Sequence, residues 1–92
     1  PTQVGVLPVA DRHADRAREV AADLEGRGLR VSVDERGESV GRKIRDAELR
    51  KLPFMVVIGD EEVESGRLAV RSHDEGDIGA MTPDSLAERV GS

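Results

Sequence analysis

The sequence predicts an α/β domain in which a mixed five-stranded sheet and three helices form three layers. Strand-like and helix-like segments alternate over residues 3–58, an order that produces parallel strands joined by right-handed crossovers. The run at residues 54–58 is apolar throughout, which is typical of a central strand covered on both faces. The later strand-like segments have short connections, so they are expected to pair antiparallel at one edge.

Two strands flank the first predicted helix. Residues 3–9 contain apolar side chains and end beside a proline, as a strand does. Small and apolar side chains recur at helical spacing over residues 13–25, and Gly26 ends that pattern. Residues 29–33 alternate between apolar and polar types, which predicts a strand with one covered face.

A polar loop at residues 34–38 precedes the second predicted helix. Ser39 can cap this helix and Pro53 limits it, so the helix is expected to extend to about Leu52. Its inner face is expected to hold Val40, Ile44 and Ala47. Its outer face is expected to carry the basic side chains Arg42, Lys43, Arg45, Arg50 and Lys51.

The second half of the chain contains shorter elements. Residues 60–66 are expected to form an acidic turn after the central strand. Residues 67–71 alternate in polarity and predict a strand, and a short fifth strand is expected around Ile78 in a glycine-rich stretch. Thr82 with the following proline starts the last helix.

Length and composition indicate one soluble domain spanning residues 1–92. The chain is 37% hydrophobic and 36% charged, with a net charge of -5. It contains no cysteine, which excludes disulfides and thiolate metal sites, and Phe54 is its one aromatic residue, so the core must be aliphatic. No apolar run approaches the roughly 20 residues that cross a bilayer. We expect a cytoplasmic domain without membrane contact, excised from a longer protein.

Basic residues concentrate in the middle of this acidic chain. Residues 36–51 carry six basic and three acidic side chains, whereas residues 52–92 carry three and nine. Such a patch, which includes Arg36, could hold a phosphate backbone while the rest of the domain repels it. The alternative is a solvated helix whose arginines pair with Asp46 and Glu48.

Motifs for a phosphate loop, a catalytic nucleophile or a metal centre are missing from the sequence. Residues 8–11 stand where a glycine-rich phosphate loop would follow the first strand. His13 and His73 are far apart without neighbouring ligands, and are expected at the surface. The carboxylates at 60–64 allow three interpretations: a solvated turn, a contact to base edges, or an acid/base pair.

Five stretches carry a resemblance to a known family. They are residues 1–9 (PTQVGVLPV), 28–36 (GLRVSVDER), 40–47 (VGRKIRDA), 51–60 (KLPFMVVIGD) and 62–71 (EVESGRLAVR). In this order they resemble the anticodon-binding domain of class II aminoacyl-tRNA synthetases, most closely that of threonyl-tRNA synthetases. The resemblance covers nearly the whole chain and implies the class II synthetase anticodon-binding fold.

The resemblance also implies a function. The domain is expected to hold the anticodon loop of threonine-specific tRNA at the C-terminal end of a threonine–tRNA ligase. By itself it is then neither an enzyme nor a cofactor-binding domain, because ATP and zinc belong to the catalytic part of the parent, through which the parent is expected to dimerise. Alternatives are the domain of a prolyl, histidyl or glycyl synthetase, a repurposed protein-binding domain, or a phosphoacceptor receiver domain around Asp60.

The resemblance assigns base reading to Glu62 and Arg71, which match the family's readers of the second and third anticodon bases. Both are expected beside the carboxyl end of the central strand, and the alternative is an exposed ion pair between them. Contacts to the RNA backbone or loop are implied for Arg36, Gly37, Lys43 and Arg45.

Three positions depart from the family's pattern, and one has a second interpretation. Gly37 stands where asparagine is usual, Ser39 where lysine is common, and Arg42 where an aromatic residue is usual. We therefore expect looser anticodon discrimination, since an amide, a charge and a stacking surface are lost. Arg45 could pair with a local carboxylate instead of RNA.

Overall fold

Five strands form one mixed sheet in the computed structural model, which describes residues 1–91. The strands are β1 (Val4–Pro8), β2 (Val31–Val33), β3 (Phe54–Ile58), β4 (Leu68–Ser72) and β5 (Gly76–Met81). Their order across the sheet is β2-β1-β3-β4-β5. β1 pairs parallel with β2 and β3, whereas β4 pairs antiparallel with both β3 and β5. The predicted mixed sheet and its antiparallel edge are confirmed.

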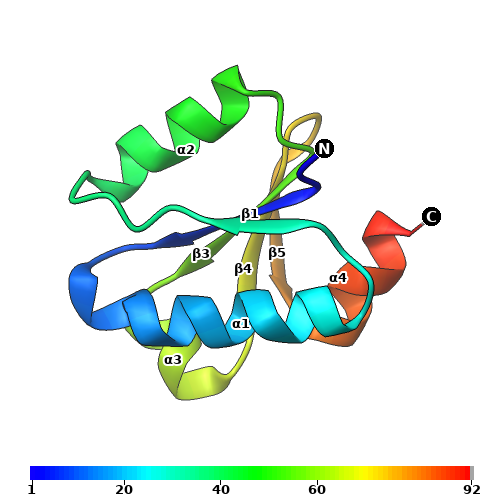
Figure 1. The fold of residues 1–92 in the computed structure, drawn as a ribbon, viewed down its shortest axis with the longest axis horizontal. Helices are drawn as coiled ribbons and strands as arrows, with labels where there is room; N and C mark the ends of the chain where they lie inside the picture. The colour runs from blue at the N-terminus through cyan, green and yellow to red at the C-terminus, as the bar shows by residue number, and fades with distance from the viewer. Residues whose placement is uncertain (92) are drawn as a thin grey trace.

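Helices cover both faces of this sheet and give the predicted three layers. They are the short 3-10 helix η1 (Asp11–His13), α1 (Ala14–Gly26), α2 (Val40–Leu49), α3 (Asp60–Ser65) and α4 (Pro83–Val90). α1 and α4 lie together on one face, and α2 lies alone on the other (Figure 1). α2 therefore leaves part of its face of the sheet open.

The prediction of an acidic turn at residues 60–66 is wrong, because most of that segment forms the helix α3. The described residues thus contain four α-helices rather than three. Three carboxylates in the first turn of α3 suit the positive end of the helix dipole. Gly66 ends the helix in the left-handed conformation, with φ 76°. No residue of α3 is buried, so the apolar periodicity that predicts helices is missing here.

The core is aliphatic and divides into two clusters across the sheet. Alternate residues of β1 enter different clusters, with Val4 and Val6 facing α1 and Leu7 facing α2. On the α2 face the Leu52 side chain packs directly on Gly5, where a Cβ would lie 2.8 Å from Leu52 Cδ1. A glycine is therefore required at this position of β1 for Leu52 to pack as it does.

β2 and α2 are both shorter than predicted, for local reasons. The N–H of Leu29 donates to the Leu24 carbonyl at the end of α1, so β2 begins only at Val31. α2 begins after Ser39, whose Oγ accepts the Arg42 N–H at 3.2 Å, which confirms the predicted cap. It ends at Leu49 instead of Leu52, because the chain turns back at Lys51.

Lys51 is the one non-glycine residue among the described residues with a positive φ, 58°. This left-handed conformation costs an L-residue roughly 1 kcal/mol or more, whereas glycine adopts it freely. The N–H groups of Lys51 and Leu52 return to the Glu48 and Ala47 carbonyls, so the turn closes α2 and brings Leu52 to the sheet.

We expect Lys51→Gly to raise the free energy of unfolding by about 0.5 to 1 kcal/mol in urea denaturation, because it relieves the strained φ. Arg50→Gly is the matched control. It removes the same charge at a residue with φ -80°, and should destabilise by up to about 1 kcal/mol. Equal effects of the two substitutions would show that backbone strain at Lys51 is not the cause.

Candidate nucleic-acid interface

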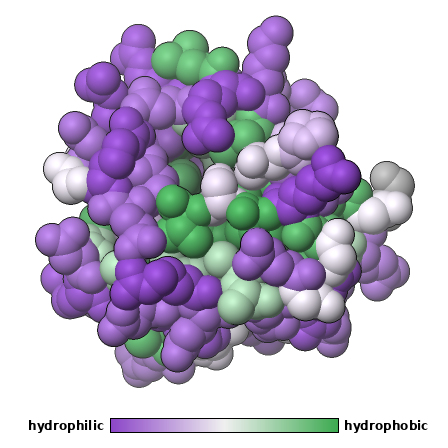
Figure 2. All heavy atoms as spheres, in the orientation of Figure 1, coloured by the Kyte–Doolittle hydropathy of each residue, from purple (hydrophilic) through white to green (hydrophobic). Residues whose placement is uncertain are grey.

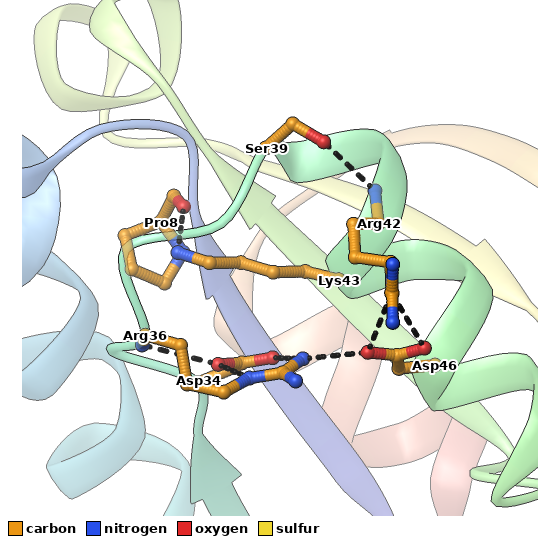
Figure 3. Close-up of polar contacts among 7 residues, drawn as sticks. All are labelled: Pro8, Asp34, Arg36, Ser39, Arg42, Lys43 and Asp46. Carbon is orange, nitrogen blue, oxygen red and sulfur yellow. Dashed lines mark hydrogen bonds and ion pairs between the residues drawn. The ribbon is translucent and has the colours of Figure 1, made fainter.

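An ion-pair network joins the loop after β2 to α2 (Figure 3). The Arg36 guanidinium donates to both oxygens of Asp34, at 2.9 and 2.7 Å, and to Asp46 Oδ2 at 2.9 Å. Arg42, one turn before Asp46 on α2, donates to the same carboxylate at 3.3 Å. Two of the arginines expected to face RNA are therefore already paired with carboxylates.

The network lowers the pKa values of its two carboxyl groups, Asp34 and Asp46. Hydrogen bonds from Arg36 lower the pKa of the Asp34 carboxyl, and the charge of Lys43 acts in the same direction. The same guanidinium lowers the pKa of Asp46, with a further contribution from Arg42. Both carboxylates thus stay ionised and continue to neutralise the arginines at any pH near neutrality.

Lys43 does not lie on the outer face of α2, as the sequence had led us to expect. Lys43 is 3% exposed, and its Nζ donates to the Pro8 carbonyl at 2.9 Å (Figure 3). Lys43 follows Val40 by three residues and precedes Ala47 by four, so helical geometry places it on the inner face. Its ammonium group anchors α2 to the end of β1 rather than extending into solvent.

Three exposed cations on α2 and in the turn after it have side chains without a hydrogen bond or ion pair in the described part of the chain: Arg45, Arg50 and Lys51. The alternative that Arg45 pairs with a local carboxylate is wrong. Arg45 lines a shallow groove of about 380 Å³ with Arg42, Asp46 and Leu49. The basic patch that is free to attract phosphates is therefore half as large as the sequence indicated.

A second groove, of about 500 Å³, separates α2 from β1 and β2. Leu7, Ala47 and Leu52 contribute its apolar lining, and Arg36 and Asp46 are among its charged residues. Figure 2 shows apolar side chains gathered in the middle of this face of the molecule, surrounded by hydrophilic ones. Leu49 is 72% exposed beside both grooves.

Glu62 lies on α3 and caps its first turn. Its Oε1 accepts the Gly59 N–H at 2.8 Å, the reciprocal part of a capping box. Its other carboxylate oxygen has no hydrogen-bond partner among residues 1–91. Glu62 is half-buried, so this free acceptor is held on a fixed side chain at the carboxyl end of β3.

Arg71 lies on β4, directly opposite Met55 near the start of β3. The side chain is half-buried, and its Nε is fully buried without a hydrogen-bond partner in the described residues. Buried N–H groups are almost always paired, so an orphan donor on an arginine requires an explanation.

The structure does not bring Glu62 and Arg71 together. β4 runs antiparallel to β3, so Arg71 lies toward the amino end of β3, whereas Glu62 follows its carboxyl end. The strand from Met55 to Ile58 separates them by roughly 10 Å. The expectation that both lie at the carboxyl end is wrong for Arg71, and no ion pair joins the two residues in the described chain.

Gly37 is exposed in the loop between β2 and α2. A Cβ at this position would meet nothing within 4 Å, and its φ lies outside the left-handed region. Neither space nor backbone conformation requires a glycine here.

A cluster that the sequence analysis missed lies at the same edge as Glu62. Asp60, the first residue of α3, accepts from Arg12 at 3.0 and 2.8 Å and from His13 Nε2 at 2.5 Å. The hydrogen bonds from Arg12 and then from His13 hold the pKa of this carboxyl far below its usual range. His13 is 2% exposed, so the expectation of a surface histidine is wrong. The predicted topology already indicated this proximity. Because β1 and β3 are parallel neighbours, the residues that follow their carboxyl ends lie close together.

The described residues offer neither a metal-binding cluster nor a membrane-spanning helix. Among residues 1–91, no three His, Cys, Asp or Glu side chains are grouped so as to hold a metal ion. Within the same residues, every helix is too short or too polar to cross a membrane.

Comparisons with known proteins converge on one family. The family described as "Anticodon binding domain" matches residues 3–92. A threonine–tRNA ligase of Syntrophomonas wolfei is 50% identical over 90 residues, which cover 98% of this chain and 14% of that protein. The enzyme of the same name from Chloroherpeton thalassium is 51% identical over 81 residues, or 88% of this chain and 12% of that protein.

A solved structure has the same fold. The RNA-binding domain of threonyl-tRNA synthetase from Cryptosporidium parvum Iowa II matches 99% of this chain with a TM-score of 0.87 and 29% identity. This chain covers 23% of that one. The 92 residues thus span only about 14% of the curated relatives they match.

We expect acid to weaken the fold through Asp34. Its folded pKa lies below the unfolded value of about 3.9, so its contribution is complete above about pH 5 and is lost as the pH falls toward the folded pKa. Urea unfolding between about pH 6 and pH 3 should show a smaller loss of stability for Asp34→Asn than for the unmodified chain. Equal losses would mean that the Arg36 pairing does not survive in solution.

Proposed function

Because this chain belongs to the anticodon binding domain family, we propose that it holds the anticodon loop of threonine tRNA for a larger cytoplasmic threonine–tRNA ligase. In that parent, a separate catalytic domain with its own ATP and zinc sites attaches threonine, and that domain also forms a homodimer. The 92 residues contribute recognition and no chemistry.

The observation that carries this proposal is the orphan donor of Arg71. The Nε–H is buried without an acceptor, on a strand where α2 does not cover the sheet. The planar guanidinium of this half-buried side chain can give two parallel hydrogen bonds to a base edge with carbonyl or ring-nitrogen acceptors, once the buried Nε–H turns outward to meet it. Arg71 is therefore proposed as one base reader.

Glu62 is proposed as the second reader, with the opposite hydrogen-bonding character. An ionised carboxylate only accepts, so its free oxygen suits a ring N–H or an exocyclic amine. Arg71 and Glu62 lie toward opposite ends of β3, which spans roughly 10 Å from Met55 to Ile58. Each residue is thus proposed to contact a different anticodon base.

Contacts to the RNA backbone are proposed for the exposed cations on α2 and in the turn after it. Arg45, Arg50 and Lys51 have no competing carboxylate, so they can displace counterions from phosphates. Arg36 and Lys43 instead fix the loop and helix that present Gly37 and Arg45. The anticodon loop then lies across α2 and the open part of the sheet.

Base reading predicts that Glu62→Gln and Arg71→Ala each lower discrimination between the threonine anticodon stem-loop and a base-substituted one, by about 1 to 3 kcal/mol. Glutamine at position 62 can still accept the Gly59 N–H, so α3 keeps its cap. The measurement is the ratio of dissociation constants at fixed salt.

Arg18→Ala is the control, because Arg18 lies on α1, across the sheet from α2, and pairs with Asp15 and Glu35. It should leave the ratio unchanged. If Glu62→Gln and Arg71→Ala weaken binding to every stem-loop equally, the assignment of base reading fails.

Salt dependence should distinguish Arg45 from Lys43. The logarithm of the binding constant falls with that of salt at a slope of about -0.7 per phosphate contact for single-stranded RNA. Arg45→Ala should make the slope shallower by about 0.7, whereas Lys43→Met should leave it unchanged and destabilise the fold by about 1 to 3 kcal/mol. The reverse pattern would place the phosphate contact on Lys43.

A further inference from the structure

α3 has unusually little support from the core. It contains six residues, none of them buried, and its one large apolar side chain, Val63, is 46% exposed. Isolated helices of this length do not persist in water, so something other than apolar packing must hold α3 in place. Its position matters because Glu62 lies on it.

The hydrogen bonds that hold the start of α3 come from the 3-10 helix η1. Arg12 and His13 belong to η1, which follows β1, and together they occupy both oxygens of Asp60. The His13 ring is buried, and its Nδ1 accepts the Ala10 N–H at 3.1 Å. Nε2 of the neutral ring therefore carries the hydrogen and donates to Asp60. The buried His13 ring thus holds the first residue of α3 in place through a hydrogen bond.

Asp60 and Glu62 are both connected to Gly59, in the turn between β3 and α3. Asp60 follows Gly59 directly, and Glu62 closes on the Gly59 N–H at 2.8 Å. Val9 lies against this turn from the β1 side, since a Cβ on Gly59 would be 3.2 Å from Val9 Cγ2. Any movement of Asp60 away from Arg12 and His13 therefore displaces the carboxylate of Glu62.

We infer that Arg12, His13 and Asp60 are positioning residues, which hold α3 so that Glu62 meets its anticodon base in one fixed place. This inference rests on the proposed function of Glu62. It extends the recognition site to η1, which contains no residue proposed to contact RNA. Fixing a recognition group by its supporting residues is a general requirement of specific sites.

The test uses the 92-residue chain, the threonine anticodon stem-loop and a stem-loop substituted at one anticodon base. Asp60→Asn removes the accepting charge, and Arg12→Gln removes a donor while leaving the Asp60 carboxylate in place. Asp23→Asn is the matched control, because it removes the same charge from an arginine–aspartate pair on α1. Urea unfolding verifies that all three variants are folded.

We expect Asp60→Asn and Arg12→Gln to lower the ratio of dissociation constants roughly fivefold or more, whereas Asp23→Asn leaves it unchanged. Hydrogen exchange of the Val63 and Gly66 amides, which bond within α3, should accelerate in the same two variants. A merely structural role would weaken binding to both stem-loops alike and leave their ratio unchanged.

Unchanged discrimination in both variants would overturn the inference, whether or not amide exchange in α3 accelerates. The proposed function fails separately, if Glu62→Gln itself leaves discrimination intact. In that case the exchange rates alone decide whether Arg12, His13 and Asp60 hold α3.

Discussion

The parallel pairing of β1 with β3 places the ends of both central strands at one edge of the sheet. Three separate anchors meet there because of it. The Pro8 carbonyl accepts a hydrogen bond from the Lys43 ammonium, the Asp60 carboxylate accepts from Arg12 and His13, and the Gly59 N–H donates to Glu62. An antiparallel pair would have put these groups at opposite ends of the sheet. The loop before α2, the start of α1 and the helix α3 are thus fixed relative to each other by two strands.

More of the basic residues in this domain make contacts within the fold than its composition indicates. Arg36 and Arg42 pair with Asp34 and Asp46, and Lys43 is buried, so only part of the basic stretch faces solvent. Exposed ion pairs contribute little to stability individually, but a shared carboxylate fixes a loop against a helix. The few unpaired cations then define where an anionic partner can lie, and the acidic remainder of the chain limits its extent.

Apolar patterns predicted most of the fold, and their absence explains what was missed. The continuous run of β3 and the alternation of β4 were sufficient for the sheet, and Ser39 for the start of α2. α3 buries nothing and so has no such pattern. The positions of the site residues were predicted less well, because basic residues were assigned to the solvent face of α2 by their type and not by their place in the helical repeat. Lys43 shares a face with Val40 and Ala47, and the antiparallel direction of β4 already places Arg71 away from Glu62. The Arg12–Asp60 contact joins residues 48 positions apart and needs the register of β1 and β3.

The buried ammonium of Lys43 has an effect on the field around the domain. Salt screens exposed charges within about 10 Å at 0.1 M, but acts much less on a charge enclosed by protein. Lys43 therefore supplies a constant positive potential beneath α2, which Asp34 offsets in part. This interaction between Lys43 and Asp34 within the fold persists at ionic strengths that screen the exposed charges of Arg45, Arg50 and Lys51.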